Sequence, residues 1–544
     1  MSWLAGLECA ASRAAYAAGV GAREGAAEVP AVVVVDSDCP YQRRLLRLGA
    51  VRRSPSIRAI AASAPKAAKD QAVAFVDEYE RIPWELVMRK PHLVANSFCI
   101  RKSLIRKANL AAHVDGCERK SAARRAGVAG GGRAPSGPMA TAQASLGCFV
   151  PESTVVDLFE ATTSSSAARA YGGRRAAIQA SLDEDVGEIL PDSAEPGGPV
   201  WLLKPSMGNK GGELHLVRCF DDAVKATASW PDVAQWVLQR YVAPPLTALG
   251  GRKFHLRVYV MARGALDVYV YRQALVLLAT LPHAKAAGAA GGELVGEAAH
   301  SLITNTCFAA ERAGFDEARS VRLLSELPEA LDAPGEQGAA GPGAGSAHAA
   351  ACAASGAHWG EEATRVVYGG VREAVARLFA SLQGSVGGFM PLPNAYELYG
   401  LDFVVRSTDL RPMLLEVNAG PDLKQTGGRL QGLISNLLDD TMETSLMPMV
   451  RAKLAGKFVE PGAGPEIRAS LAARARSPAV PSWAQWDGVE PVALRDSLEG
   501  ALPGTDGGFR LGEANGWDPV LSMDWHVQDM DVSVSAGGDA AACE

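Results

Sequence analysis

The chain has 544 residues, a hydrophobic fraction of 48%, a charged fraction of 21% and a net charge of −6. This length exceeds what one hydrophobic core usually organises, so two or three packed subdomains are expected. The longest apolar runs, such as those from Ala31 and Ala274, are too short to span a bilayer, and we expect no membrane partner. The first thirty residues contain no basic region followed by an apolar core, as a signal peptide would, so the expected location is cytoplasmic.

Cysteine and histidine usage excludes several classes of site. The nine cysteines are scattered and never spaced as C-x-x-C, and the nine histidines form no H-x-x-x-H pair. These patterns predict neither a disulfide framework nor a zinc site. The chain also lacks the G-x-S-x-G elbow of a serine hydrolase. Metal chemistry would therefore rest on oxygen ligands, which favours magnesium.

Hydrophobic periodicity predicts a mixed α/β chain. The predicted strands lie at 31–35, from Trp201, from Trp236, and at 252–262, 266–278, 401–406 and 413–418. Helical or amphipathic segments are predicted at 66–80, 104–113 and 361–382. A turn at Arg263-Gly264 joins the pair at 252–278. Antiparallel pairs that alternate with helices favour an α+β fold over a doubly wound parallel sheet.

Stretches rich in Ala, Gly and Pro interrupt this pattern. They lie at 126–145, 284–299 and 332–358, and they read as inserted loops without core residues. From about residue 460 the periodicity weakens again, and only isolated tryptophans such as Trp483, Trp486, Trp517 and Trp525 stand out. We expect this C-terminal part to be partly disordered and to dock through its tryptophans.

The segment from Arg101 to Arg125 is basic, with eight Lys or Arg residues against two acids. It suits an acidic partner, and it equally suits an ordinary solvated surface. Because it lacks interleaved aromatic residues for base stacking, and no recognisable nucleic-acid-binding fold surrounds it, we expect no DNA partner.

Two late strands carry the strongest candidate site. Glu416 and Asn418 in LLEVNAG point to one face of their strand, since side chains alternate, while Leu415 and Val417 face the opposite side. With a turn near Asp409, Asp402 in YGLDFVV falls opposite Glu416, roughly 5 Å away across the ladder. Two carboxylates and an amide oxygen are ligands that magnesium prefers. Taken alone, this spacing also fits two solvated acids flanking a turn.

The strand RKFHLRVYV places polar residues on one face and apolar residues on the other. The apolar face holds Phe254, Leu256, Val258 and Val260, and the polar face holds Lys253, His255, Arg257 and Tyr259. Three cationic groups in a row would bind an anion such as a triphosphate or an activated carboxylate. A solvent-facing sheet surface usually mixes both signs of charge, and this one does not.

The segment WLLKPSMGNKGGELHLV combines an apolar strand with a glycine-rich loop. Lys204 ends the strand, and Gly208, Lys210 and Gly211 belong to a loop whose backbone N–H groups can approach phosphate oxygens. By itself a glycine-rich hairpin is usually only a turn. The strand WVLQRYV, at 236–242, ends where its backbone can meet an adenine edge.

Together and in this order, these segments resemble the tubulin-tyrosine ligase family of ATP-grasp enzymes over roughly residues 81–435. The motifs are K-P-S with its glycine loop at 204–212, Q-R-Y at 239–241, K-F-H-x-R at 253–257, T-N-T at 304–306, and G-L-D-F with L-L-E-V-N-A-G-P-D at 400–422. The segment from residue 251 looks most like the divergent branch that includes the plant, fungal and ligase-like-twelve proteins.

The resemblance implies an ATP-grasp fold with antiparallel sheets sandwiching the nucleotide, an N-terminal α/β subdomain and low-complexity insertions. The implied cofactors are ATP and Mg²⁺, with the metal on Asp402, Glu416 and Asn418. The implied nucleotide contacts are Lys204, Gly208, Lys210, Gly211, Gln239, Arg240, Tyr241, Val242, Lys253 and His255. Lys253, Arg257 and Asn305 are the implied catalytic residues.

The implied division of the chain has five parts. They are an N-terminal extension at 1–30, a subdomain at 31–150 with the basic segment and a disordered linker, a central ATP-grasp subdomain at 151–300, a C-terminal one at 301–455 with a disordered insert at 332–358, and an extension at 456–544.

The implied activity joins a free amino acid to a protein carboxylate through an acyl phosphate. The implied acceptor is tubulin or another acidic-tailed protein, with an association to microtubules as a further expectation. Three positions depart from the family: Glu213 replaces the last loop glycine, Leu277 replaces an arginine of tyrosine-adding members, and His300 lies farther than usual from Thr304. The alternative is an ATP-binding scaffold that regulates or recruits a partner without turnover.

Overall fold

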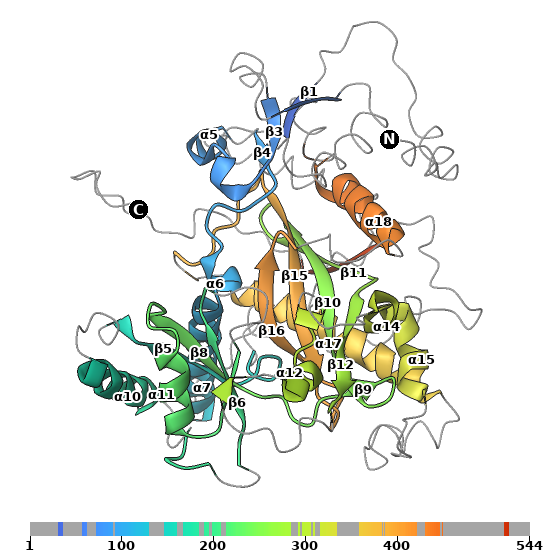
Figure 1. The fold of residues 1–544 in the computed structure, drawn as a ribbon. Coiled ribbons are helices and arrows are strands. Elements are labelled where there is room, and N and C mark those ends of the chain that lie inside the picture. The colour runs from blue at the N-terminus through green and yellow to red at the C-terminus, as the bar shows by residue number, and fades with distance from the viewer. Residues whose placement is uncertain are drawn as a thin grey trace, which may run out of the picture.

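The computed structural model describes most of the chain between residues 72 and 446 and four short parts outside it. The outside parts are 31–35, 57–61, 449 and 516–521. The gaps within 72–446 are 91–92, 130–145, 160–166, 184–189, 195–197, 208–213, 284–291, 294–295, 306–307, 310–315, 334–357, 383–384, 386 and 422–429. Three sheets organise the described residues (Figure 1).

The first sheet is parallel, as expected of an N-terminal α/β subdomain. Its order is β2-β1-β3-β4, and its strands are β1 Ala31–Val35, β2 Ile57–Ala61, β3 Ala72–Val76 and β4 Val94–Ala95. The predicted strand at 31–35 is confirmed. The helix predicted at 66–80 is wrong over its described part, because the run AVAFV forms β3 and residues 73–76 are buried in succession. A continuous apolar run fits a buried strand as well as a helix.

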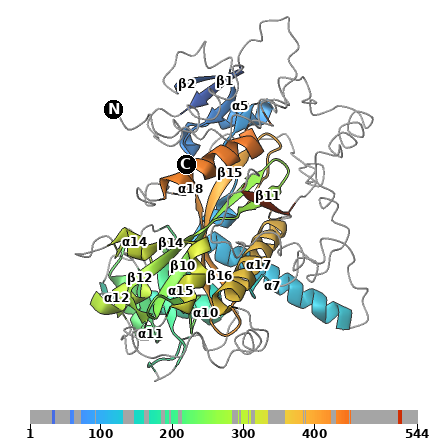
Figure 2. The same cartoon turned by 90° about the vertical axis from the view of Figure 1, so that its right-hand side faces the viewer.

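Helix α5 Trp84–Arg89 connects β3 to β4, and α6 Lys102–Ile105 and α7 Lys107–Ala129 follow the sheet. The basic segment therefore forms α6 and most of α7, which Figure 2 shows running past α17 and away from the sheets. The helix also takes in 126–129, so the inserted loop predicted at 126–145 begins too early. Residues 130–145 lie outside the described part.

The small sheet has five antiparallel strands in the order β13-β7-β6-β8-β5. Its strands are β5 Ser153–Asp157, β6 Trp201–Pro205, β7 His215–Val217, β8 Gln235–Arg240 and β13 Gly292–Glu293. Helices α10 Ala167–Asp183 and α11 Phe220–Ala228 pack on it through an apolar cluster that includes Ile178, Phe220 and Trp236. The strands predicted from Trp201 and Trp236 are confirmed.

The large sheet has eight antiparallel strands. They are β9 Thr247–Ala248, β10 Arg252–Arg263, β11 Asp267–Tyr271, β12 Leu275–Pro282, β14 Val321–Leu323, β15 Tyr396–Val405, β16 Pro412–Ala419 and β17 Trp517–Leu521. The single strand predicted at 266–278 is two strands, β11 and β12, which pair with opposite ends of β10. Along the chain, β5 to β8 belong to the small sheet and β9 to β12 to the large sheet, and β13 then returns to the small sheet. The subdomain boundary at residue 300 stays a prediction.

Helices pack on both faces of the large sheet through apolar side chains, in the part of the sheet that is distant from the small sheet. On one face, Phe254, Leu256 and Val258 share a core with α15 Leu327–Asp332 and α17 Trp359–Ser381, which confirms the predicted apolar face of β10. On the other face, α18 Gln431–Thr441 packs on Tyr259 and Met261 at the end of β10. The first residues of β10 on that second face, Lys253, His255 and Arg257, are not part of this apolar cluster.

Local structure corrects one further expectation and, at Trp517, agrees with another, that the C-terminal part docks through its tryptophans. The loop predicted at 284–299 contains β13 and the start of helix α12 Gly296–Leu302. The C-terminal extension contributes β17, which pairs with β11 and buries Trp517 against Tyr271, with ring centroids 4.9 Å apart. Residues 334–357 and most of 456–544 lie outside the described part.

No helix in the described ranges is both long and apolar enough to cross a membrane.

The buried position of Trp517 predicts that residues far beyond the family-like region stabilise the large sheet. Trp517→Ala should lower the free energy of unfolding by ~3–5 kcal/mol, because a fully packed aromatic side chain is lost. Denaturant titration of the full chain measures this loss. The matched control is Trp230→Ala, at a position 36% exposed, which should cost ~1 kcal/mol or less. Equal small losses in both variants would contradict the docking of β17.

Candidate functional site

Polar residues from one helix and five strands converge where the small sheet meets the large sheet. We call these residues the polar cluster; it comprises Lys107, Lys204, Gln239, Lys253, His255, Arg257, Asp402, Glu416 and Asn418. The two sheets touch directly here, because Lys204 Nζ on β6 donates to the carbonyl oxygen of Leu415 on β16 at 3.3 Å. The expected meeting of antiparallel sheets around one set of polar side chains is therefore present.

Arg257 and Asp402 form the most buried ion pair of the cluster. The guanidinium donates to both carboxylate oxygens, Nε to Oδ1 at 2.5 Å and Nη2 to Oδ2 at 2.9 Å. The two residues are directly opposite each other on β10 and β15. Burial raises the pKa of Asp402 to about 6 against the effect of Arg257, so the carboxylate is mostly ionised at pH 7. Arg257 thus orients Asp402 rather than standing free for an anion.

The predicted register of the late hairpin is confirmed, since Asp402 pairs with Glu416. A bulge follows at once: Phe403 pairs with Leu414, which leaves Leu415 as the extra residue of β16. The predicted core position of Leu415 is therefore wrong, and the core side of β16 is formed by Leu414 and Val417. Bulges redirect backbone groups next to functional sites. Here the bulge gives Lys204 its carbonyl partner.

Lys204 is fixed by a chain of hydrogen bonds within the small sheet. Its Nζ donates to Gln239 Oε1 at 2.8 Å, and Gln239 Nε2 donates to Ser153 Oγ at 3.1 Å. Burial lowers the pKa of Lys204 to about 8, although Glu416 opposes the shift. In this structure Gln239 holds the lysine, a role that the sequence motif did not indicate.

Lys253 lies beside Tyr241 at the edge of the cluster. Its Nζ donates to the carbonyl oxygen of Leu302 at 3.1 Å and stands 4.6 Å from the Tyr241 ring centroid. The Tyr241 hydroxyl lies 2.8 Å from His283 Nε2. Burial lowers the pKa of Lys253 to about 8. A buried cation with few polar partners is readily stabilised by an anion.

His255 is not one of the cations that the sequence predicted. Its Nδ1 lies 2.6 Å from Thr304 Oγ1 and its Nε2 lies 3.9 Å from Asp402 Oδ1. Burial, and then the charge of Arg257, lower the pKa of His255 to about 3, so the ring is neutral at pH 7. Thr304 is therefore the residue of the T-N-T motif that contacts the polar cluster. The next residue, Asn305, is partly buried at the end of the same short segment.

Lys107 is the member of the cluster that sequence reasoning missed. It is the first residue of α7, and its Nζ lies 3.4 Å from Glu416 Oε2. Burial would raise the pKa of Glu416, but Lys107 and then Lys204 outweigh it and hold that pKa at about 2. The only sequence signal for Lys107 was its place in the basic segment, which does not distinguish it from its exposed neighbour Arg106.

The residues present fit a divalent cation bound through oxygen atoms. Asn418 Nδ2 lies 3.4 Å from Asp402 Oδ2 and 3.3 Å from Glu416 Oε1, so the amide bridges the two carboxylates. The oxygen and nitrogen of an amide fill nearly the same space, and the side chain can present its oxygen there. Among the described residues no group of three or more His, Cys, Asp and Glu converges. Two carboxylates and one amide are thus the available donor set.

Some predicted contacts lie away from the cluster or outside the described part. The Arg240 side chain points away from Lys204 and pairs with Glu152 at 3.1 Å on the exposed surface, so only its backbone can face the site. Val242 follows β8 and is partly buried. Gly208, Lys210, Gly211 and Glu213 lie outside the described residues.

The Arg257–Asp402 pair predicts a large cost when one partner is removed. Arg257→Met leaves a buried carboxylate uncompensated and should lower the free energy of unfolding by ~3–5 kcal/mol. Arg406→Met breaks the comparable Arg406–Asp409 pair, whose side chains are 33% exposed, and should cost ~1 kcal/mol or less. Chemical denaturation compares the two. Similar losses of unfolding free energy in the two variants would show that burial does not determine how much the Arg257–Asp402 pair matters for stability.

Comparison with known proteins gives a consistent result. The family model for the tubulin-tyrosine ligase family matches residues 158–323 and 364–453. Probable tubulin–tyrosine ligases of Saccharomyces cerevisiae and Schizosaccharomyces pombe are 24% and 28% identical over 49% and 40% of this chain. The aligned parts cover 38% and 43% of those relatives, so the chain spans less than half of their length.

Among solved structures, the C-terminal domain of K. lactis Pby1, an ATP-grasp enzyme that interacts with the mRNA decapping enzyme Dcp2, aligns with 78% of this chain and 94% of its own. The sequence identity is 23% and the TM-score is 0.49. The two ranges that match the family model contain every member of the polar cluster except Lys107. Over the region that holds this cluster, the chain matches the tubulin-tyrosine ligase family.

Proposed function

We propose that the chain is an ATP- and Mg²⁺-dependent ligase that joins the amino group of an amino acid to a protein carboxylate through an acyl phosphate. The acceptor is tubulin or another protein with an acidic tail. The observation that carries the proposal is the polar cluster, in which cations and metal-type ligands from both sheets meet at one point. The match to the family supports the ligase class.

The charge balance of the cluster supports binding of a polyanion with a metal. Four cationic side chains, Lys107, Lys204, Lys253 and Arg257, surround two carboxylates, Asp402 and Glu416. Burial lowers the pKa of two of these lysines to about 8, so nearby negative charge would stabilise their charged forms. Magnesium-bound nucleotide supplies such charge, together with a phosphoryl group that can activate a carboxylate.

The chain's own residues would act by positioning and electrostatics. Asp402, held by Arg257, and Glu416 would fix the metal, while Lys204 and Lys253 would neutralise phosphate oxygens as charge develops. Tyr241 and the backbone at the end of β8 would border the base. No protein nucleophile is needed, because an oriented substrate carboxylate and amine supply the reacting atoms.

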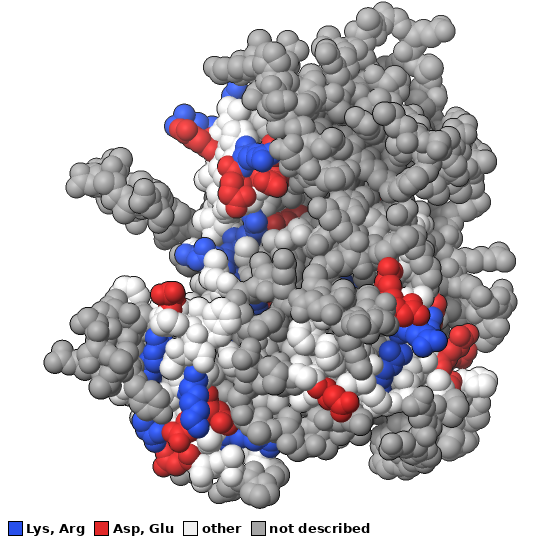
Figure 3. All heavy atoms as spheres, in the orientation of Figure 1, with Lys and Arg blue, Asp and Glu red and all other residues white. Residues whose placement is uncertain are grey.

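The partner assignment rests on charge. Lys102 lies on α6 and Arg106 lies between α6 and α7; both are exposed and close in sequence to Lys107, and they would attract an acidic peptide. On the face in Figure 3, described acidic and basic residues are interspersed, so no single-sign patch dominates that view. We propose a cytoplasmic enzyme that meets its acceptor along α7.

A nucleotide-binding scaffold without turnover is the second candidate, and Leu277 favours it. Leu277 pairs with His255 across β10 and β12, and it is buried in the apolar cluster under α18. A charged residue that grips a substrate carboxylate is therefore absent from this position. Turnover decides between the two candidates.

Glu416→Gln should abolish magnesium-dependent ATP consumption and leave the fold intact, because the amide keeps the shape of the side chain and loses its charge. The assay is ADP release by purified full-length chain with magnesium, tubulin and the twenty amino acids. Glu152→Gln, a change of the same kind in the exposed pair with Arg240, is the control and should behave as wild type. Undiminished turnover in Glu416→Gln would remove this residue from the metal site.

Lys204→Ala should raise the dissociation constant for magnesium-ATP by about 10- to 100-fold, since a charge-assisted contact in a buried site is lost. Isothermal titration calorimetry measures this change. Lys225→Ala, on the exposed side of α11, is the matched control. An unaltered dissociation constant would refute the phosphate-binding role.

Mass spectrometry of tubulin tails after the same incubation tests the acceptor. An increase in the mass of a tubulin tail by one amino-acid residue would identify both the ligase activity and the transferred amino acid. Measurable ATP binding without consumption supports the scaffold.

A further inference from the structure

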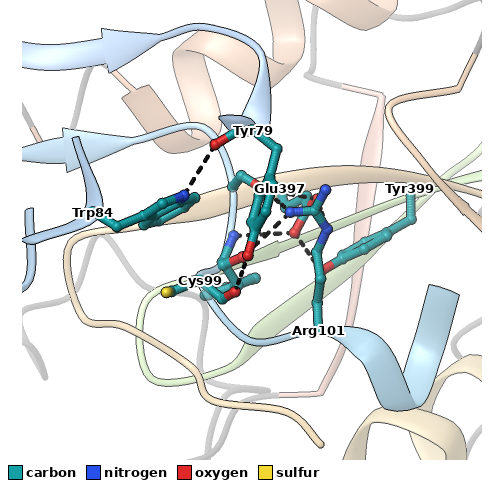
Figure 4. Close-up of polar contacts among 8 residues, drawn as sticks. Tyr79, Trp84, Cys99, Arg101, Glu397 and Tyr399 are labelled. Carbon is teal, nitrogen blue, oxygen red and sulfur yellow. Dashed lines mark hydrogen bonds and ion pairs between the residues drawn. The ribbon is translucent and has the colours of Figure 1, made fainter. Parts of the chain in front are cut away.

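A second buried charged group lies at the start of β15, five residues before Asp402 (Figure 4). It centres on Glu397, which is 4% exposed, and on Arg101, whose side chain is 13% exposed. Arg101 Nε lies 3.0 Å from Glu397 Oε1. A strand rises about 3.3 Å per residue, so this pair is ~16 Å from the metal-type ligands. It cannot contact the same ligand atoms.

The Glu397 carboxylate is satisfied by groups from two parts of the chain. It accepts hydrogen bonds from Ser97 Oγ at 3.0 Å, from the Phe98 backbone N–H at 3.1 Å and from the Tyr399 hydroxyl at 2.7 Å. Burial raises the pKa of Glu397, and the Arg101 guanidinium opposes that shift. Three hydrogen bonds to one buried carboxylate favour a single arrangement of the elements that carry the donors.

The Arg101 side is equally restrained. Its Nη1 donates to Ser97 Oγ at 2.7 Å, and its guanidinium lies 4.0 Å from the centroid of the Tyr79 ring. The Tyr79 hydroxyl donates to the carbonyl oxygen of Cys99 at 2.6 Å, and Trp84 Nε1 donates to the carbonyl oxygen of Tyr79 at 3.0 Å. Figure 4 shows Tyr79 and Glu397 beside the guanidinium, and Trp84 farther away on the other side of Tyr79. The segment just before α6 therefore has a single position on β15.

Apolar packing alone would position α7 less sharply. Next to Lys107, α7 meets the small sheet through Ala108 and Ala111 against Val237, and it buries Leu110 and Val114 in the core around the large sheet. Farther along the helix, His113 Nε2 lies 2.9 Å from Ser381 Oγ on α17. Apolar contacts are non-directional, so they specify the position of the first turn less sharply than a buried ion pair does. A buried ion pair adds little net stability compared with apolar residues of the same size, and its best attested use is to fix register.

The two ion pairs tie one short segment to one hairpin. Arg101 binds Glu397 on β15, and six residues later Lys107 binds Glu416 on β16. Between them lies only α6, which packs on the hairpin through Leu104. The first pair therefore sets where the second can form.

We propose that Arg101 and Glu397 are positioning residues that set the register of α7 and so deliver Lys107 to the nucleotide-binding site. This inference rests on the proposed function for its consequence, because Lys107 matters only if the polar cluster binds the nucleotide. Arg101 lies outside the ranges that match the family model, so the segment before those ranges is an integral part of the site.

The test is a double-mutant cycle on magnesium-ATP affinity in the full-length chain. Glu397→Gln should weaken binding by about 3- to 10-fold, and Lys107→Met by about tenfold. In the Lys107→Met background, Glu397→Gln should cause no further loss, since residues that act through one another are not additive. Arg101→Lys, which keeps the charge, should recover part of the affinity that Arg101→Gln loses.

Two controls separate positioning from general destabilisation. Arg119→Gln breaks an exposed pair with Asp115 on the same helix and should leave affinity unchanged. Ile178→Ala opens the apolar cluster under α10 and should lower stability without any coupling to Lys107. Amide hydrogen exchange of the first turns of α7 gives a readout that needs no nucleotide, and protection should fall in Glu397→Gln and in Arg101→Gln but not in Arg119→Gln.

Each outcome has a distinct meaning. If Glu397→Gln weakens binding equally with and without Lys107, or leaves α7 protected, the positioning role is overturned. If wild type binds no magnesium-ATP, the proposed function fails, and the exchange result alone then decides whether Glu397 sets the position of α7.

Discussion

The site depends on the ion pair between Arg257 and Asp402. Two strands that are far apart in sequence, β10 and β15, meet at this pair, and each partner makes the burial of the other tolerable. Because the guanidinium takes both carboxylate oxygens, Asp402 has one orientation, and Glu416 across the hairpin acquires a defined neighbour. Lys253 lies on β10 itself, and Lys204 and Lys107 approach from β6 and α7. The central pair and Glu416 together give these like charges fixed counter-charges.

Burial sets the chemistry of the cluster as much as residue type does. The same environment that lowers the pKa of Lys204 and Lys253 to about 8 leaves His255 neutral. Three residues that alternate on one strand therefore act differently: Lys253 remains a cation for an anion, His255 bonds to Thr304, and Arg257 orients a carboxylate. The bulge at Leu415 adds a backbone carbonyl, so the small sheet is tied to the large one at the position where the proposed substrate would lie.

The N-terminal segment changes how the site is divided among parts of the chain. Strands from the family-like region supply the metal-type ligands, while α7 supplies Lys107 from outside it. The Arg101–Glu397 pair gives a physical reason for this arrangement, since a directional buried pair adds a defined register to the apolar contacts of α7. β17 shows the same principle at the other end of the chain, where Trp517 and Asp518 attach a distant strand to β11 and α17.

The sequence by itself determined the antiparallel hairpins, the face on which Lys253 and Arg257 lie, and the pairing of Asp402 with Glu416, because strand alternation and turn position are local properties. The register followed once the turn was placed near Asp409. Only the tertiary structure decided that His255 is neutral, that Leu415 forms a bulge, that the basic segment delivers Lys107, and that residues 72–76 form a strand. These features depend on burial and on partners remote in sequence, and local periodicity contains neither.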